Sequence, residues 1–308
     1  MYSSLMSILV LGASGLVGSA TLKELQKQNK PAIGASRADV DLLNRQDTFE
    51  FIRKVKPDMV VDAAAKVGGI GANDKFPVNF LSENLQIQTN LIDACHEFKV
   101  EKFIFLGSSC IYPRNCPQPI QEDALLTGIL EPTNSAYAIA KIAGLELIKS
   151  YRKQYKYKWI TVMPTNLYGP RDNFDLENSH VLPALIRKFV EAKRNNVESV
   201  MLWGTGSAVR EFLFVEDLAR AIIFCSDNYD SDDHINIGTG VGISIKELAE
   251  KIAKLTNFQG RILWDSSKPD GMPRKVLNID KITKLGWRPN VALDDGILKT
   301  IAWYEESH

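Results

Sequence analysis

The sequence of 308 residues has few cysteines, no excess of charge of either sign and no long hydrophobic run. Its cysteines form no C-x-x-C pair and no disulfide framework, so we expect a reducing compartment and no metal site. Lys plus Arg and Asp plus Glu each number 37, which argues against a broad surface for nucleic acid. No stretch approaches the roughly 20 apolar residues that span a bilayer. The four cysteines are Cys95, Cys110, Cys116 and Cys225. Together these absences predict a cytoplasmic protein that binds neither nucleic acid nor membrane.

The first half of the chain alternates short apolar runs with helical patterns. We predict strands at residues 5–11, 31–36, 59–65, 102–107 and 159–164, and helices at residues 17–28, 48–55, 84–98 and 136–155. Strands that are apolar throughout belong to a parallel sheet with helices on both faces. The apolar start carries no basic leader and no cleavage site, so we expect a buried first strand there and not a targeting segment.

Beyond residue 165 long polar connections separate helices near residues 181–194, 215–226 and 244–256. The fold class predicted from both halves is α/β, with a Rossmann-type doubly wound parallel sheet and a smaller C-terminal α/β substrate-binding domain. We expect the Rossmann domain to cover residues 1–165 and to be rejoined by residues near 211–236. An interleaved cap would then comprise residues 166–308.

A glycine-rich turn follows the first strand. Gly12, Gly15 and Gly18 permit a tight turn, close approach of the backbone to a pyrophosphate, and close packing of helix on strand. The next helix would offer its N–H groups and its positive dipole end to the phosphates. Arg37, just after the second predicted strand, favours the extra phosphate of NADP over NAD. We therefore predict that residues 1–165 bind NADPH.

Tyr137 and Lys141 are spaced to share one face of a helix, and Ser108 follows a strand. The tyrosine–lysine pair alone is weak evidence, but ligands of doubly wound sheets bind at the carboxyl ends of the strands. A neighbouring ammonium is expected to lower the pKa of the tyrosine, which could then exchange a proton with a carbonyl.

The residues Gly12, Gly15, Gly18, Ser108, Tyr137 and Lys141, in this order, resemble the extended short-chain dehydrogenase/reductase family, which modifies nucleotide sugars. More specific blocks resemble its GDP-L-fucose synthase family, and the resemblance runs from Gly12 to Trp287. These blocks are residues 63–70 (AAAKVGGI), 106–113 (LGSSCIYP), 131–134 (EPTN), 164–170 (PTNLYGP), 172–174 (DNF) and 179–181 (SHV).

This resemblance implies epimerisation of GDP-4-keto-6-deoxy-D-mannose at carbons 3 and 5, followed by reduction of the 4-keto group with NADPH to give GDP-L-fucose. Both carbons flank a carbonyl, so inversion needs one group that removes a proton and another that delivers one to the opposite face. Cys110 resembles the family's base, and if the strand continues past Ser108 both side chains point the same way. His180 resembles the family's acid, and an ordinary histidine pKa near 6.5 suits that role.

The resemblance also implies binding residues. The cofactor would contact Gly12, Ala13, Ser14, Gly15, Leu16, Val17, Gly18, Arg37, Ala64, Leu106, Gly107, Lys141, Pro164, Asn166, Leu167 and His180. The substrate would contact Lys188, Trp203, Arg210 and Asp270. Some family members carry bulky or basic residues where this turn has Ala13 and Ser14, which leaves more of the NADP preference to Arg37. The family also implies a homodimer, formed by the helices at residues 84–98 and 136–155.

Three alternatives remain open on the sequence. A sister enzyme that makes GDP-L-colitose from a dideoxy-sugar could share Cys110, His180 and the triad of Ser108, Tyr137 and Lys141. A nucleotide-sugar 4-epimerase with tightly held NAD would leave Cys110 and His180 idle and consume no cofactor. A non-catalytic dinucleotide sensor would have no need of Tyr137 and Lys141.

Overall fold

A parallel six-stranded sheet forms the centre of the computed structural model, which describes residues 6–268 and 270–308. The strand order is β2-β1-β3-β4-β5-β9, and every neighbouring pair is parallel. The strands are β1 (Ile8–Leu11), β2 (Ala32–Ala35), β3 (Met59–Asp62), β4 (Lys102–Leu106), β5 (Ile160–Pro164) and β9 (Ile235–Ile237). The chain passes to β2 on one side of β1 and to β3 on the other, so the carboxyl ends of β1 and β3 open a binding position. The predicted doubly wound α/β class is confirmed.

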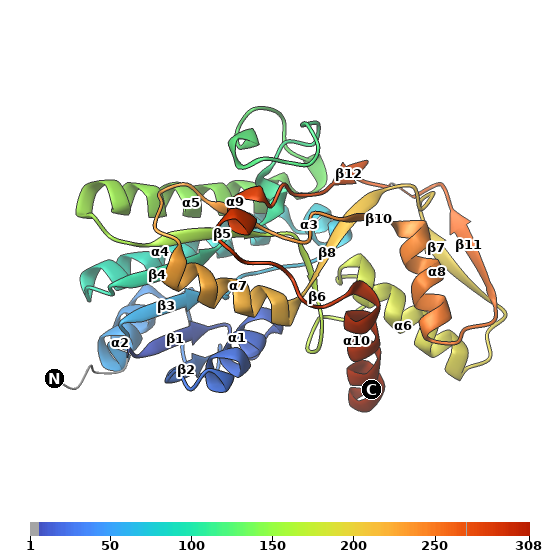
Figure 1. Ribbon diagram of the computed structural model, residues 1–308, viewed down its shortest axis with the longest axis horizontal. Helices are drawn as coiled ribbons and strands as arrows, with labels where there is room; N and C mark the ends of the chain where they lie inside the picture. The colour runs from blue at the N-terminus through green and yellow to red at the C-terminus, as the bar shows by residue number, and fades with distance from the viewer. Residues whose placement is uncertain (1–5, 269) are drawn as a thin grey trace.

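Helices cover both faces of this sheet, as Figure 1 shows. On one face, α1 and α7 pack over Val10, Val61 and Ile104. On the other, α2, α4 and α5 pack over Leu9, Val60 and Phe103. The alternation along each strand sends consecutive side chains to opposite faces, and both faces are apolar because both are buried. These helices are α1 (Leu16–Lys27), α2 (Arg45–Val55), α4 (Pro77–Glu97), α5 (Ser135–Tyr155) and α7 (Val215–Asn228).

The predicted elements of the first half agree with the structure except at some ends. The first predicted strand starts at residue 5, which lies outside the described residues, and β1 begins at Ile8. Helix α4 begins at Pro77, seven residues before the predicted start, because proline is favoured in the first turn of a helix. The short helix α3 (Ile70–Lys75) was not predicted, since its six residues are too few to show a period.

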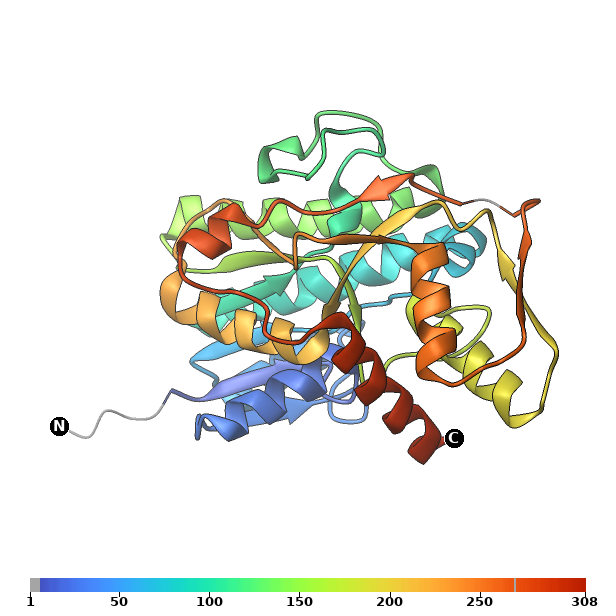
Figure 2. The same ribbon diagram turned by 45° about the vertical axis from the view of Figure 1, so that its right-hand side comes forward.

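A second group of elements lies at the right of Figure 1 and comes forward in Figure 2. Strand β8 pairs with β6, β10 and β12, while β7 pairs with β11. Helices α6, α8 and α10 share one apolar core that includes Phe189, Ile252 and Ile297. The elements of this second group are β6 (Asn166–Tyr168), α6 (Val181–Arg194), β7 (Ser199–Trp203), β8 (Val209–Phe214), β10 (Gly242–Ser244), α8 (Ile245–Leu255), β11 (Arg261–Asp265), β12 (Arg274–Lys275) and α10 (Leu293–Ser307). The short helix α9 (Asp280–Lys284) packs instead beside β9 of the central sheet.

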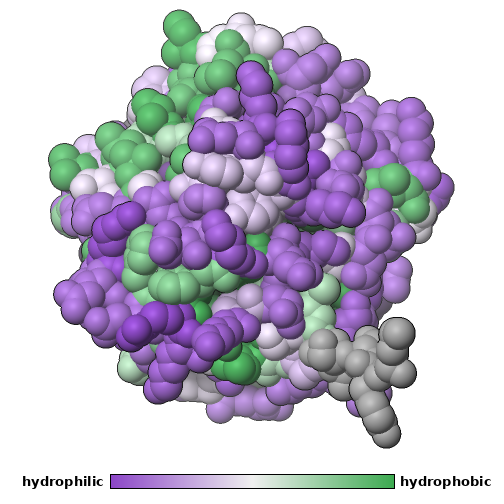
Figure 3. All heavy atoms as spheres, turned by 90° about the vertical axis from the view of Figure 1, so that its left-hand side faces the viewer, coloured by the Kyte–Doolittle hydropathy of each residue, from purple (hydrophilic) through white to green (hydrophobic). Residues whose placement is uncertain are grey.

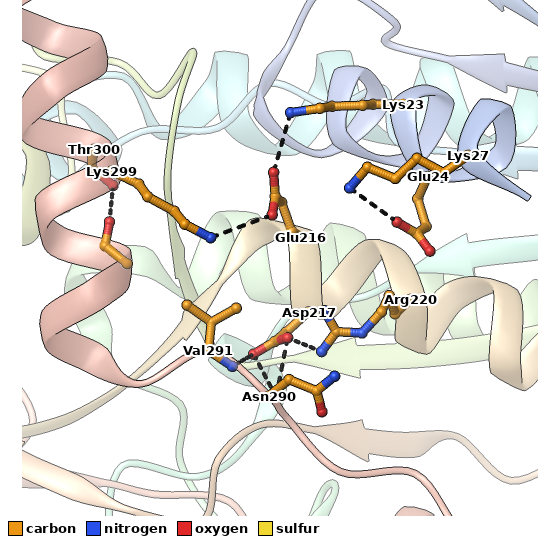
Figure 4. A network of polar contacts seen from close by, with 11 residues as sticks. Lys23, Glu24, Lys27, Glu216, Asp217, Arg220, Asn290, Val291, Lys299 and Thr300 are labelled. Carbon is orange, nitrogen blue, oxygen red and sulfur yellow. Dashed lines mark hydrogen bonds and ion pairs between the residues drawn. The ribbon is translucent and has the colours of Figure 1, made fainter.

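A polar network joins the two groups of elements (Figure 4). The carboxylate of Asp217, fully buried in α7, accepts hydrogen bonds from the backbone N–H of Asn290 and Val291 and pairs with Arg220. The Glu216 carboxylate forms ion pairs with Lys23 Nζ of α1 at 3.3 Å and with Lys299 Nζ of α10 at 3.9 Å. Because the Asp217 carboxylate is buried, its hydrogen bonds hold the segment that leads into α10 in place. The exposed ion pairs of Glu216 contribute little to stability.

The surface is mostly polar on the side drawn in Figure 3, with hydrophobic side chains gathered mainly toward one edge. Scattered apolar side chains are ordinary on a protein surface. Of the helices in the described residues, none has both the length and the apolar character needed to cross a membrane.

Candidate active site

The glycine turn has the geometry that a pyrophosphate requires. Gly12 has a φ of +71°, and a Cβ there would lie 2.5 Å from Ala63 O. Gly15 precedes α1 as its N-cap and provides no side chain to satisfy the first N–H groups of the helix. The first turn of α1 also carries no acidic residue, so nothing competes with an anion there. The turn therefore fits a dinucleotide.

Gly18 makes the close packing of helix on turn possible. A Cβ at Gly18 would lie 2.2 Å from Gly12 O, whereas the nearest atom to a Cβ at Gly15 is at 3.4 Å. We expect Gly18→Ala to lower the free energy of unfolding by about 1–3 kcal/mol, because the contact is with backbone that must shift. Gly15→Ala is the matched control and should melt close to the unmodified protein. Equal melting temperatures for the two variants, measured by thermal unfolding without ligand, would contradict this account of Gly18.

The end of β2 carries a cation and no carboxylate directed at a ribose. Arg37 is exposed, two residues beyond Ala35. The carboxylate of Asp39 instead accepts hydrogen bonds from the N–H and hydroxyl of Ser36, each at 2.8 Å, which lower its pKa. This arrangement is the one expected for NADP.

Ser108 and Cys110 do not lie on a continued strand. Strand β4 ends at Leu106, and the residues Ser109–Ile111 form a 3₁₀ turn, η1. The Ser108 hydroxyl caps this turn by accepting a hydrogen bond from Cys110 N at 3.3 Å. The condition under which both side chains would share one strand face is therefore not met, since serine prefers to cap a turn. The turn nevertheless keeps Cys110 beside Ser108.

Cys110 is half-buried, and two polar side chains donate toward its sulfur. Asn134 Nδ2 lies 3.4 Å from Cys110 Sγ and Lys275 Nζ lies 3.8 Å from it. Asn134 ends the 3₁₀ turn η3 (Pro132–Asn134), and Lys275 lies in β12 with only 9% of its surface exposed. The Lys275 ammonium is therefore a cation placed directly beside the Cys110 sulfur.

His180 precedes α6 as its N-cap and is exposed to solvent. Desolvation by the surrounding protein, and then the charge of Lys275, lower the pKa of His180 to about 4. The expectation of an ordinary histidine pKa is thus not met, because the same ammonium that faces Cys110 disfavours an imidazolium. The Lys275 ammonium therefore lies beside the Cys110 sulfur and also lowers the pKa of His180.

Tyr137 lies in the first turn of α5, with its ring edge-on to Phe80 at 6.3 Å. Burial raises the pKa of Tyr137, the charge of Cys110 adds to this, and a hydrogen bond with Ser108 opposes it. The expectation that Lys141 lowers this pKa is not met. The burial of the phenol dominates, and Lys141 Nζ instead donates to Leu106 O at 2.8 Å. The phenol stays protonated at neutral pH, as a proton donor to a ketone must.

The remaining residues expected to bind the cofactor lie near the carboxyl ends of the strands. Lys141 is buried and its ammonium lies 4.7 Å from the centre of the Phe105 ring. Asn166 Nδ2 donates to Glu211 O at 2.7 Å. The strand-end positions are Ala64 after β3, Leu106 and Gly107 at the end of β4, Pro164 at the end of β5, and Asn166 and Leu167 in β6.

Two cations of the second group are half-buried. Arg210 in β8 donates to Val209 O at 2.9 Å and to Asp270 O at 3.3 Å, and burial lowers its pKa, against the charge of Cys110. Lys188 in α6 donates to Met201 O at 3.0 Å, and partial burial lowers its pKa. A guanidinium can grip a phosphate with two parallel hydrogen bonds, while an ammonium acts as a point charge.

Trp203 and Asp270 lie farther out. Trp203 is 61% exposed at the end of β7, with Lys268 Nζ 5.7 Å from its ring centre. Both carboxylate oxygens of Asp270 accept hydrogen bonds from Thr205, at 2.8 Å from its N–H and from its hydroxyl. Asp270 therefore orders the loop after Trp203 in this structure.

Sequence reasoning missed Lys275, Asn134 and Asp62. Lys275 is 165 residues from Cys110 along the chain, and only the pairing of β12 with β8 brings it to the sulfur. Asn134 was quoted within a motif but given no role. Asp62 ends a strand whose other residues are apolar, so it was counted with the core.

Comparison with known proteins agrees with this geometry. The sequence profile of the NAD dependent epimerase/dehydratase family matches residues 8–238. The chain is 52% identical to GDP-L-fucose synthase 1 of Arabidopsis thaliana, over 96% of this chain and 92% of that one. It is 39% identical to the GDP-L-colitose synthase of Yersinia pseudotuberculosis, over 97% and 98%. A GDP-L-fucose synthetase from Naegleria fowleri bound to NADP superposes with a TM-score of 0.90 at 30% identity, over 98% and 94%. The chain belongs to the NAD dependent epimerase/dehydratase family and, within it, to the branch that contains the GDP-L-fucose synthases.

Proposed function

We propose that this protein converts GDP-4-keto-6-deoxy-D-mannose to GDP-L-fucose, by epimerisation at carbons 3 and 5 followed by reduction of the 4-keto group with NADPH. The observation that carries the proposal is the surroundings of Cys110. The Cys110 thiol lies two residues from Ser108, and its charge contributes to the raised pKa of Tyr137. Lys275 Nζ lies 3.8 Å from Cys110 Sγ, and the charge of Lys275 also lowers the pKa of His180. One site thus holds groups for proton transfer at carbon and groups for ketone reduction.

The proposed cofactor fits the residues present. The glycine turn offers the N–H groups of α1, and exposed Arg37 stands where the extra phosphate of NADP would lie. Buried Lys141 would bind the ribose next to the nicotinamide, as the family resemblance implies. When bound, NADPH supplies the hydride that reduces the ketone.

In the epimerisation, the Cys110 thiolate takes the proton from the carbon beside the carbonyl, and the electrons pass to the carbonyl oxygen as an enolate. Ser108 and Tyr137 stabilise that oxygen by hydrogen bonds. His180 delivers a proton to the opposite face, which inverts the carbon. Because His180 is neutral at pH 7 in this structure, we infer that it gains its proton in the complex, where the negative pyrophosphate and enolate offset Lys275.

In the reduction, Tyr137 gives its phenolic proton to the carbonyl oxygen. Its raised pKa keeps the donor protonated before the step. Ser108 stays within reach of the same oxygen through its contact with Tyr137. The GDP pyrophosphate is expected to contact Arg210 and Lys188, with Trp203 and the loop held by Asp270 nearby.

Lys275 should matter for epimerisation more than for reduction. We expect Lys275→Met to slow exchange of hydrogen at carbons 3 and 5 by about 10–100-fold, because the sulfur loses the ammonium that stabilises its negative charge. Lys275→Arg keeps a cation and should recover much of that rate. Exchange is followed by mass spectrometry in D₂O, and the reductase step by oxidation of GDP-L-fucose with NADP⁺. A loss that falls equally on both steps, or no rescue by arginine, would contradict this role.

The homodimer also belongs to this proposal. Helices α4 and α5 lie side by side, and Val78 and Ile139 leave apolar surface exposed on them. We also propose a cytoplasmic location, because Cys110 must stay a free thiol to act as a base.

The test of the proposed function is turnover with two ketone substrates. We expect loss of NADPH absorbance with GDP-4-keto-6-deoxy-D-mannose, one NADPH for each GDP-L-fucose formed. The relative from Yersinia pseudotuberculosis favours one alternative, a dideoxy-sugar substrate, and turnover restricted to that substrate would select it. Product formed without loss of NADPH would be an epimerised ketone and would show the epimerase without the reductase. A redox-neutral 4-epimerase acts on a sugar with a 4-hydroxyl group, so failure to convert either ketone would direct the test to such a sugar.

A further inference from the structure

A buried carboxyl group that the proposed mechanism does not use lies behind Lys141. Asp62 is the last residue of β3 and is 1% exposed. Its register partners are Leu11 in β1 and Phe105 in β4. The rest of β3 is apolar, so a carboxyl at this place must be compensated by something nearby.

Alternation along the strand places Asp62 on the same face as Val60, the face covered by α4 and α5. The Lys141 ammonium enters that layer from α5. It donates to Leu106 O at 2.8 Å and lies 4.7 Å from the centre of the Phe105 ring. Because Phe105 is the cross-strand partner of Asp62, the carboxyl and the ammonium flank the same side chain.

The hydrogen bonds of Asp62 leave half of the carboxyl without a partner. Oδ1 accepts from Ala64 N at 3.2 Å, while Oδ2 is buried and has no hydrogen-bond partner within residues 6–268 and 270–308. A buried carboxylate oxygen without a donor is costly unless an opposite charge acts on it. The opposite charge that acts on Asp62 is that of Lys141.

We propose that Asp62 is a positioning residue of the reductase, whose buried carboxylate is the counter-ion that keeps the Lys141 ammonium charged. This inference rests on the function proposed above, in which Lys141 works beside Tyr137. A lysine placed in a dry layer without a counter-ion would lose its proton more readily and with it the ability to donate hydrogen bonds to a ribose.

The titration behaviour of the layer agrees with the geometry. Burial raises the pKa of Asp62 to about 6, and the charge of Lys141 opposes this. Burial lowers the pKa of Lys141, and the charge of Asp62 opposes that. The other titratable groups that face Asp62 are Cys95 of α4 and Tyr137 of α5, and both stay neutral because burial raises the pKa of each. Above about pH 6 the layer therefore holds one anion and one cation.

The pairing can be tested without any substrate. A carboxyl whose folded pKa is raised favours the folded state at low pH and loses that contribution as pH rises through the folded value. Relative to the unmodified protein, Asp62→Asn should therefore gain stability between about pH 4 and 6 and level off above. When both proteins also carry Lys141→Met, the pH at which this gain in stability levels off should rise by about one unit or more. An unchanged position would overturn the proposal whatever the substrate is.

Asp172→Asn is the matched control for that experiment. Asp172 is half-buried, but its Oδ2 is buried and has no hydrogen-bond partner among the described residues, and desolvation raises its pKa to about 7. Lys141 is not among the groups that shift it. Its stability profile should therefore be the same with and without Lys141→Met, and a parallel movement would mean that Lys141→Met acts on the whole protein.

The second test measures the reductase step by oxidation of GDP-L-fucose with NADP⁺. We expect the rate of the unmodified protein to rise with pH through about 6, as Asp62 ionises. In Asp62→Asn this rise of the rate with pH, the acid limb of the profile, should vanish, and kcat at pH 7.5 should fall about tenfold. The decline of the rate at high pH should begin at a lower pH, because Lys141 loses its proton more readily without the carboxylate. Exchange at carbons 3 and 5 should stay within about twofold. A merely structural role would not remove the limb.

Three outcomes overturn the proposal in this assay. They are an acid limb that persists in Asp62→Asn, a kcat that stays within about twofold, and a limb that vanishes in Asp172→Asn instead. No oxidation of GDP-L-fucose by the unmodified protein would overturn the proposed function, and the stability experiment would then decide the pairing by itself.

Discussion

Replacing Cys110 by serine is expected to lower exchange of solvent hydrogen at carbons 3 and 5 by about 10²–10⁴-fold, the range that a positioned acid or base contributes. The serine hydroxyl is not ionised at neutral pH, so the donors that remain, Asn134 and Lys275, have no anion to stabilise. Oxidation of GDP-L-fucose by NADP⁺ should continue, because that step involves Ser108, Tyr137 and Lys141. Fold and dimer should be retained, since serine is nearly isosteric with cysteine.

The matched control is Cys116→Ser. Cys116 is half-buried like Cys110 and lies six residues further along the chain. It should keep the full rate of exchange. Full exchange in Cys110→Ser, measured as deuterium in recovered substrate and product, would remove Cys110 as the base.

Tyr137→Phe is expected to lower the rate of reduction by about 10²–10⁴-fold and epimerisation much less. Phenylalanine preserves the edge-on packing with Phe80 but has no proton to give to the carbonyl oxygen. Epimerisation keeps Ser108 as a donor to the enolate oxygen, together with Cys110 and His180. The variant should therefore accumulate epimerised ketone, which NMR of the reaction mixture can detect.

Tyr155→Phe provides the control on the same helix. Tyr155 ends α5 and is exposed, and its hydroxyl accepts a hydrogen bond from Gln154. Its removal should change neither step. If Tyr137→Phe lowered exchange and reduction to the same degree, the two steps would share Tyr137 as an essential group, and the separation of roles would be wrong.

The order of the Rossmann elements could be predicted from the sequence because each strand is mainly apolar and the long helices show their period. The glycine turn was equally predictable, since Gly12 and Gly18 must accept contacts that no side chain permits. The short strands of the second half were not, because β6, β9, β10 and β12 have only two or three residues each. Such strands are fixed by pairing with β8 or β5, which is information about distant segments.

The electrostatics of the site were beyond sequence reasoning for the same reason. A pKa depends on burial and on charges from other elements, so neither the low pKa of His180 nor the raised pKa of Tyr137 follows from motifs. Lys275 acts on Cys110 across 165 residues, and Asp62 meets Lys141 only through the register of β3 with β4.

The central claim is that one chain performs two inversions and one reduction on the same ketone. Turnover of GDP-4-keto-6-deoxy-D-mannose with unlabelled NADPH in D₂O, with mass and NMR analysis of the product, tests it most directly. The account predicts GDP-L-fucose with solvent deuterium on the carbon at both positions 3 and 5, and one NADPH oxidised for each molecule formed. A reduced product with no deuterium at those carbons would contradict it.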